Sequence, residues 1–240
     1  MAVQYSFPSY GEAVSEVLEK FGGQKMQTYR GKDITPLWDF KGGPLVQAYK
    51  HLYSAPKLEK IVTGVQSFSD KLMSYATIIW PDDQHALPVC SSYWAESAKG
   101  SYFIIDFYPL ADCICDIPYM ETYLEPLEDL CRAGKKHFPD IPSRNPNWFN
   151  AMTSPYLINA DFHPSTKETQ DRLLKITLDY LEVYCSLWEK DEPRDAEYMK
   201  RLIERKEAIR QNMFEKDPGG LMVEQAVGKE LADLNLMVLF

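Results

Sequence analysis

The stretch from Lys71 to Leu110, KLMSYATIIWPDDQHALPVCSSYWAESAKGSYFIIDFYPL, decides the fold. Apolar runs that are rich in β-branched and aromatic residues are separated here by short segments with Pro, Asp and Gly. Such runs are typical of strands that are joined by turns. The stretch therefore predicts three consecutive strands of one sheet, at Leu72 to Trp80, Ala86 to Trp94 and Ser101 to Phe107.

The middle strand combines aromatic residues with small polar ones, among them Cys90 and Ser91. Small polar side chains beside aromatic rings can form the floor of a site for a flat ligand. We therefore expect the chemistry of the protein on one face of this strand.

Working outward, the sequence predicts helices before and after the strands. Polar turns link a further strand, Lys57 to Phe68, to the three above, which favours an antiparallel meander. Pro44 in a first turn suggests a helix before these strands. The expected helices are Gly11 to Phe21, Pro44 to Tyr53, Tyr119 to Arg132, Ser165 to Glu189, Arg194 to Phe214 and about Leu221 to Phe240. This order predicts an α+β fold, a three-layer α/β/α sandwich with a central antiparallel sheet.

Composition narrows the class of protein. With 240 residues and 45% hydrophobic residues, we expect a single domain over 1–240, acting as a monomer. No apolar run is long enough to span a bilayer, and the N-terminus lacks the pattern of a secretory signal. We expect a soluble protein of the cytoplasm, or of the plastid stroma as a mature chain. The net charge of −9 argues against nucleic acid as a partner.

Familiar motifs for metals and cofactors are missing. The five cysteines suit a reducing compartment, and the four histidines lack ligand spacing, so we expect no metal site. There is no glycine-rich phosphate loop, dinucleotide fingerprint or nucleophile elbow. The segment from Phe138 to Thr153 lacks periodicity, carries Trp148 and Phe149, and is expected to be an ordered loop beside the site.

A series of short motifs resembles the ferredoxin-dependent bilin reductases, from about Lys57 to the last residue. Each motif is weak alone, and the shared order and spacing carry the resemblance. The motifs are Trp80-Pro81, Leu87-Pro88, Ile105-Asp106-Phe107-x-Pro109-Leu110, Tyr123-Leu124-x-Pro126-Leu127, Ser154-Pro155-Tyr156-Leu157, Asp217-Pro218-x-Gly220-Leu221 and Leu239-Phe240.

The resemblance implies a linear tetrapyrrole, such as biliverdin, held between the sheet and the C-terminal helices. It implies no bound organic cofactor or metal: reduced ferredoxin delivers single electrons, and the protein protonates a substrate radical. A proton donor there needs a raised pKa, which partial burial gives a carboxyl group. Asp217 matches one family acid, although a helix N-cap before proline is the alternative reading of this residue. The expected slot has Tyr93 and Asp217 facing each other.

The sequence departs from the family at positions that face the substrate. Tyr93 stands where the central strand of typical members carries Asp, and a phenol of ordinary pKa can orient a substrate but is a poor acid. Glu96 is a candidate replacement acid, although strand alternation puts it on the opposite face. Ala76 stands at the place of a family histidine. Asp161 stands at the place of an arginine that binds a propionate, where a carboxylate would repel that group.

Asp106 matches a shared family residue, with a structural role as the expected one. The complete set of expected substrate-binding residues is Ala76, Cys90, Ser91, Asp106, Trp148, Phe149, Tyr156, Asp161 and Phe214. Because plant-type ferredoxins are acidic, docking needs a local basic surface on this acidic chain. The candidates are Lys57, Lys60, Lys135 and Lys136.

Four readings of the function remain open from the sequence. The first is a reductase of biliverdin or a dihydrobiliverdin with altered regiochemistry, in which Asp217 is the acid and Tyr93 orients the substrate. The second is a reductase of another open-chain tetrapyrrole, such as a chlorophyll catabolite. The third is a non-catalytic bilin-binding protein, and the fourth is an interaction module with an aromatic surface.

Overall fold

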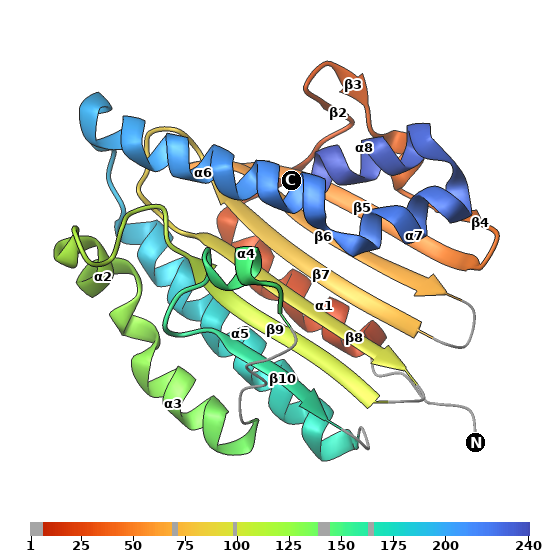
Figure 1. Ribbon diagram of the computed structural model, residues 1–240, viewed down its shortest axis with the longest axis horizontal. Coiled ribbons are helices and arrows are strands. Elements are labelled where there is room, and N and C mark those ends of the chain that lie inside the picture. The colour runs from red at the N-terminus through yellow and green to blue at the C-terminus, as the bar shows by residue number, and fades with distance from the viewer. Residues whose placement is uncertain (1–6, 69–71, 98–99, 139–144, 163–165) are drawn as a thin grey trace.

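The computed structural model describes residues 7–68, 72–97, 100–138, 145–162 and 166–240, and its centre is an antiparallel sheet (Figure 1). The strands run in the order β1-β5-β6-β7-β8-β9-β10, with β4 paired to β5, and β2 and β3 form a separate hairpin. Their bounds are β1 Gln24–Lys25, β2 Thr28–Tyr29, β3 Lys32–Asp33, β4 Phe40–Gly42, β5 Leu45–Ala55, β6 Leu58–Phe68, β7 Leu72–Pro81, β8 Val89–Ser97, β9 Gly100–Tyr108 and β10 Ile158–Phe162. The predicted meander is confirmed, since β6 to β9 pair with their neighbours in antiparallel register.

Helices cover both faces of the sheet. Figure 1 shows α1 (Phe7–Leu18) and α5 (Lys167–Lys190) on one side, and α6 (Ala196–Lys216), α7 (Pro218–Val227) and α8 (Lys229–Leu239) on the other. The remaining helical segments are η1 Glu19–Phe21, η2 Thr35–Leu37, α2 Ile117–Tyr123, η3 Glu125–Leu127, α3 Glu128–His137 and α4 Asn147–Asn150. The predicted three-layer α/β/α sandwich is confirmed.

The predicted helix from Pro44 to Tyr53 is wrong, because this segment is the strand β5. Gly43 has a φ of 52°, and Gly42 pairs with Leu45, so Pro44 lies in a hairpin turn between β4 and β5. The physical reason is a period of two. Buried residues at positions 48, 50 and 52 alternate with half-buried residues at 49, 51 and 53, as expected for a strand with one face that is more deeply buried than the other.

Smaller differences have local causes. Pro126 lies within η3, where the predicted helix from Tyr119 to Arg132 divides into α2, η3 and α3. The strand β10 was not expected, and the predicted loop before it contains the short helix α4. Residues 139–144 of that loop, and the expected first residue Ser165 of the long helix, lie outside the described residues. The helix α5 begins after Thr166, whose side chain accepts a hydrogen bond from the Thr169 N–H as an N-cap.

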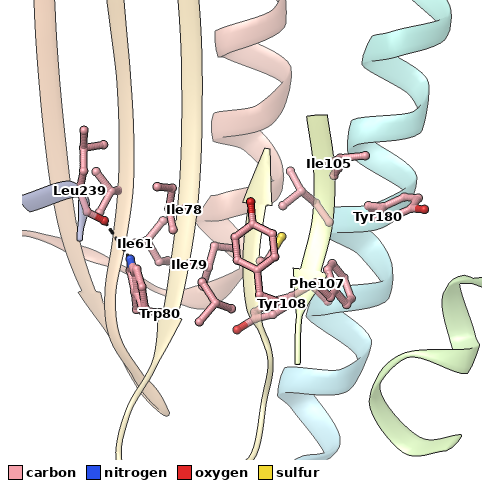
Figure 2. Close-up of a cluster of buried hydrophobic side chains, with 14 of the residues drawn as sticks. Ile61, Ile78, Ile79, Trp80, Ile105, Phe107, Tyr108, Tyr180 and Leu239 are labelled. Atoms are coloured by element: carbon pink, nitrogen blue, oxygen red, sulfur yellow. Dashed lines mark hydrogen bonds between the residues drawn. The ribbon is translucent and has the colours of Figure 1, made fainter. Parts of the chain in front are cut away.

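Contacts in the core attach the last helix, α8, to the sheet. Figure 2 shows Ile61, Ile78 and Ile79 from β6 and β7 beside Trp80 and Leu239. The fully buried indole of Trp80 donates a hydrogen bond from Nε1 to the Leu239 carbonyl, at 3.0 Å (Figure 2). A buried indole N–H needs such a partner. The contact therefore fixes α8 over β7.

A charged cluster holds α6 over the same face. The guanidinium of Arg210 donates two hydrogen bonds to the carboxylate of Glu59 on β6, at 2.6 and 3.0 Å. Lys206, one α6 turn earlier, donates to the Pro81 carbonyl and to Asp83. Burial opposes the charge of Glu59, but the contacts with Arg210 outweigh it and lower the pKa of that carboxyl to about 2. The cluster positions the C-terminal end of α6, where the candidate site lies.

Candidate active site

One row of residues crosses the sheet on a single face. Residues that are directly paired in antiparallel strands point to the same side. The row from β5 to β10 is Lys50, Gly64, Ala76, Tyr93, Ile104 and Asn159. The opposite face meets α1 and α5, since the hydroxyl of Tyr10 lies 3.2 Å from that of Ser92 and 3.0 Å from that of Thr177. The row therefore faces the layer of α6, α7 and α8.

Asp217 comes to this row from the junction of α6 and α7. Its Oδ1 accepts a hydrogen bond from the Gly219 N–H at 2.9 Å, so the residue is the N-cap of α7. Burial raises the pKa of the Asp217 carboxyl, while the Gly219 N–H and the charge of Lys50 act in the opposite sense. The N-cap reading of this residue is therefore confirmed, and burial favours the protonated form of its carboxyl.

Tyr93 lies on β8, half-buried, and shares its surroundings with Asp217. Burial raises the pKa of the phenol, and the negative charge of Asp217 raises it further, while Ser74 on β7 interacts with the hydroxyl and lowers it. Tyr93 and Asp217 are therefore close enough for the charge of one to act on the other. The phenol stays protonated at neutral pH and can donate a hydrogen bond.

The third polar group of the site, Lys50, was not predicted. Its side chain is only 3% exposed, and burial lowers the pKa of its ammonium to about 8, although the charge of Asp217 acts to raise it. The sequence analysis missed Lys50 because it assigned this segment to a helix. The signal that could have found it is the period of two in Ala48, Lys50 and Leu52, which puts Lys50 on the buried face of a strand.

Small residues make room on the floor of the site. A Cβ atom at Gly64 would lie 2.3 Å from Cδ and 2.9 Å from Nζ of Lys50, and 2.5 Å from the Tyr49 carbonyl oxygen. The Lys50 side chain therefore lies over Gly64. Ala76 follows in the row, next to Tyr93, as expected from the family position that it occupies.

Asp106 and Ser91 lie on the same face and have structural partners. The Asp106 carboxylate accepts hydrogen bonds from the Ser154 N–H at 2.8 Å and from the Ser154 hydroxyl at 2.5 Å. Burial raises the pKa of Asp106 to about 7, against the effect of these hydrogen bonds. Ser91 is paired with Asp106 and interacts with the hydroxyl of Tyr108. Asp106 thus anchors the segment after α4 to the sheet.

Aromatic residues of α4 border the site. The ring of Phe149 lies edge-on to Tyr108 of β9, with centroids 6.1 Å apart. The neighbouring Trp148 lies under the ammonium of Lys216, 5.8 Å from its ring centroid, and Lys216 immediately precedes Asp217. Phe214, on the last turns of α6, is 43% exposed. Trp148 therefore lies near the end of α6, which leads into Asp217.

Three expected site residues lie elsewhere. Cys90 pairs with Phe107, whose ring packs on Tyr184 of α5, so Cys90 faces the other layer. Neighbouring residues of a strand point to opposite faces, and the expectation that both Cys90 and Ser91 line the site is wrong. Glu96 lies on the opposite face as alternation predicts, and it accepts a hydrogen bond from Gln170 of α5 at 2.7 Å. The Tyr156 phenol interacts with Glu125, Glu128 and Cys131, on the side of α3.

Asp161 occupies the edge of the site face. It pairs with Tyr102 on the edge strand β10 and is half-buried. Four strands separate it from β5 in the strand order of the sheet. Lys50 and Asp161 therefore lie at opposite sides of the row.

Two of the four expected docking lysines serve the fold. Lys60 has no exposed side-chain area, and its ammonium lies 4.6 Å from the ring centroid of Tyr29, so the docking prediction for Lys60 is wrong. Lys57 donates to the carbonyls of Trp188 and Asp191 at 2.9 and 2.6 Å, at the C-terminal end of α5. These carbonyls have no partner within the helix, so Lys57 caps it. Lys136 is exposed in the last turn of α3, beside the half-buried Lys135.

Among the described residues, no group of three or more His, Cys, Asp or Glu side chains could hold a metal ion. No helix within the same ranges is long and apolar enough to cross a membrane.

Comparison with known proteins adds the family. A family model described as ferredoxin-dependent bilin reductase matches residues 16–240. Among solved structures, the chain is similar to phytochromobilin synthase from tomato in complex with biliverdin, with a TM-score of 0.79 and 18% sequence identity over 95% of this chain and 80% of that one. No curated protein matches the sequence.

Proposed function

The chain belongs to the ferredoxin-dependent bilin reductase family, and from this we propose that it reduces biliverdin or a dihydrobiliverdin, bound between Tyr93 and Asp217. The observation that carries the proposal is that burial raises the pKa of the Asp217 carboxyl on the face that also presents Tyr93. A raised pKa is what a proton donor needs at neutral pH.

Asp217 is the acid in this proposal. Reduced ferredoxin supplies electrons one at a time, so negative charge develops on the bilin and must be neutralised by protons. Oδ1 of Asp217 is held by the Gly219 N–H, which supports Oδ2 as the oxygen that carries the proton. A positioned general acid typically contributes about 10²- to 10⁴-fold to a rate.

Tyr93 orients the substrate rather than protonating it. Burial and the charge of Asp217 both raise the pKa of its phenol, so the phenol gives up its proton even less readily than a free one. The hydroxyl can still donate a hydrogen bond to a lactam carbonyl of the bilin. This difference from a carboxylate on the central strand supports a changed site of protonation, and thus altered regiochemistry.

The experiment is anaerobic incubation with biliverdin, ferredoxin and an electron source, with separation of the products, for the native chain and for Asp217→Asn. We expect both proteins to shift the absorbance of biliverdin, and the variant to consume it at least about 100-fold more slowly. Asparagine also serves as an N-cap, so α7 should persist.

The matched control is Asp195→Asn, the same change at the N-cap of α6, where the Asp195 side chain accepts from the Tyr198 N–H. It should leave turnover unchanged. Equal turnover in Asp217→Asn and native protein would exclude Asp217 as the acid. A native chain that binds biliverdin and never consumes it is a bilin-binding protein, and the reductase proposal then fails.

A further inference from the structure

Lys50 is a buried cation that has no hydrogen-bonded partner within the described part of the chain. Its side chain is 3% exposed, and among the described residues its ammonium makes no hydrogen bond and no ion pair. Burying a charge is costly unless it is paired. A buried ammonium without a partner in that part of the chain suggests that a bound ligand supplies the partner.

Two other buried lysines on this side of the sheet, in contrast, have partners for their ammonium groups. Lys206 is 1% exposed and donates to Asp83 at 2.5 Å and to the Pro81 carbonyl at 3.0 Å. Lys60 lies against the rings of Tyr29 and Trp80, with centroids 4.6 and 5.6 Å from its ammonium, and contacts the Met237 carbonyl. Lys50 differs from both, since Asp217 acts on it only through charge.

The position of Lys50 aims it into the candidate site. It stands in the cross-strand row with Tyr93, with only Gly64 and Ala76 between them. Its side chain lies over Gly64, where no Cβ fills the space. The charge of Asp217 acts on both Lys50 and Tyr93, so Asp217 lies near both of these polar groups.

Resting on the proposed bilin reduction, we propose that the Lys50 ammonium contacts the bound bilin and donates one of the protons that the reaction consumes. The class of ligand follows from the chemistry: a flat conjugated molecule that becomes negatively charged when it accepts an electron. An ammonium in a desolvated site both attracts that charge and can transfer a proton to it.

The step balances in atoms and charge. Reduced ferredoxin gives one electron to the neutral bilin and is oxidised, which leaves a bilin radical anion. An N–H bond of the Lys50 ammonium breaks, a new bond to hydrogen forms on the bilin, and a neutral radical and a neutral amine result. The amine then regains a proton from solvent, while Asp217 supplies the proton that accompanies the second electron.

The electrostatics of the site suit this role. Burial lowers the pKa of Lys50 to about 8, which leaves the ammonium protonated at neutral pH and still able to release its proton. The titratable group that acts on it is Asp217, from the start of α7, and Tyr93 of β8 lies in the same cross-strand row. Asp217 favours the ammonium whenever its carboxyl is ionised, and Tyr93 stays neutral in this range.

The test uses Lys50→Met and Lys50→Arg. Methionine removes the charge and keeps most of the volume, whereas arginine keeps the charge but does not release a proton at neutral pH. We expect both variants to bind biliverdin within about threefold of the native chain. We expect both to turn over about 100-fold more slowly, the loss typical of a missing general acid. The fall in native rate as pH rises through about 8 should be absent from both.

The matched control is Lys60→Met, which removes a buried lysine from the neighbouring strand. This variant should keep native turnover and the native pH profile. Native turnover in Lys50→Arg, with the alkaline fall retained, would overturn proton donation by Lys50.

A second measurement needs no turnover and uses the native chain. Lysines are acetylated at pH 8 with and without biliverdin, and the modified positions are read by mass spectrometry. We expect biliverdin to reduce the labelling of Lys50 at least fivefold and that of the exposed Lys136 not at all. Unchanged labelling of Lys50 would overturn the contact. Protection of Lys50 without any bilin reduction would support the contact and sink the proposed function, so the two failures are distinguishable.

Discussion

Asp106 is a carboxyl group whose protonation depends on its place in the fold. Burial raises its pKa to about 7 from an ordinary value of 3.8, against hydrogen bonds from Ser154 that favour the charged form. The folded chain therefore holds a proton there that the unfolded chain releases between these two pH values. Folding is linked to that proton, and stability falls as pH rises through this window.

We predict that Asp106→Asn removes this part of the pH dependence. The free energy of unfolding of the native chain, relative to the variant, should decrease between pH 4 and pH 7 and level off above pH 7. Urea titrations at several pH values provide the measurement. Parallel pH profiles for the two proteins would show that Asp106 has the same pKa in the folded and unfolded states.

At the scale of single residues, the sequence identified some members of the site and not others. The alternation within β8 predicted that Glu96 lies on the face opposite Tyr93, and its hydrogen bond with Gln170 of α5 agrees with this. Lys50 was missed, because one buried lysine in an aromatic-rich segment carries no motif. Its importance arises from charges and a glycine that lie far away in the sequence.

The strand β6 has a glycine in its interior for a steric reason. We predict that Gly64→Ala destabilises the chain by about 1 to 3 kcal/mol, the usual cost of forcing an extra methyl group into a packed region. The new Cβ would clash with the Lys50 side chain and with the Tyr49 carbonyl. Displacing Lys50 should also slow bilin reduction.

A double-mutant cycle with Lys50→Ala separates the two contacts of that methyl group. Removal of the long side chain should recover part of the loss in unfolding free energy, while the clash with the backbone remains. Additive effects of Gly64→Ala and Lys50→Ala would contradict the geometry described here.

The attachment of α6 to the sheet gives a second prediction for an element. Glu59→Gln leaves Arg210 without the more buried of its two carboxylate partners, so we expect a loss of about 3 to 5 kcal/mol in unfolding free energy. Glu207→Gln is the matched control, because Glu207 contacts the same guanidinium at 3.3 Å from a 53% exposed position. Glu207→Gln should lower the free energy of unfolding by less than about 1 kcal/mol.

The pH dependence of this contact has a defined sign. The folded pKa of Glu59, about 2, lies below its ordinary value of 4.5. Its contribution is therefore complete above the ordinary value and is lost as pH falls toward 2. Equal urea midpoints for the native chain and Glu59→Gln at pH 6 would rule out this role of the contact.

Elements with a strong periodic pattern were predicted well, and those defined by their partners were not. The strands β6 to β9 and the helices α5 and α6 each carry a clear period and definite end signals. The segment of β5 combines a proline near its start with residues that both helices and strands accept, so only its pairing with β6 settles its structure. The short strand β10 depends in the same way on β9.

The whole molecule carries a net charge of −9, which opposes the approach of an acidic electron donor. We propose that the end of α3, with Lys135 and Lys136, forms part of the ferredoxin-docking surface. Lys136→Glu should then lower kcat/KM for ferredoxin about tenfold at low salt and weaken the dependence of turnover on ionic strength.

Lys41→Glu, the same change at an exposed position on β4, is the control for net charge alone. It should change kcat/KM much less than Lys136→Glu does. An identical effect of the two substitutions would assign the result to overall charge and remove α3 from the docking surface.

The architecture of the whole molecule followed from the order of its elements. Helices before and after a meander predicted the layers, and we propose a single domain, supported by one continuous core that runs from Tyr10 to Phe240. The site could not be read in the same way. Its polar groups come from β5, β8 and the start of α7. No local sequence pattern predicts that these groups lie close together.

The bond between Trp80 and Leu239 joins residues 159 positions apart, and Asp217 reaches the sheet from the same late part of the chain. Contacts of such long range close slowly, because most of the polypeptide must be ordered before they form. During synthesis, the strands leave the ribosome before α6 and α7 do. A nascent chain therefore forms its sheet before Asp217 can join it, and the proposed site is complete only after α7 has emerged.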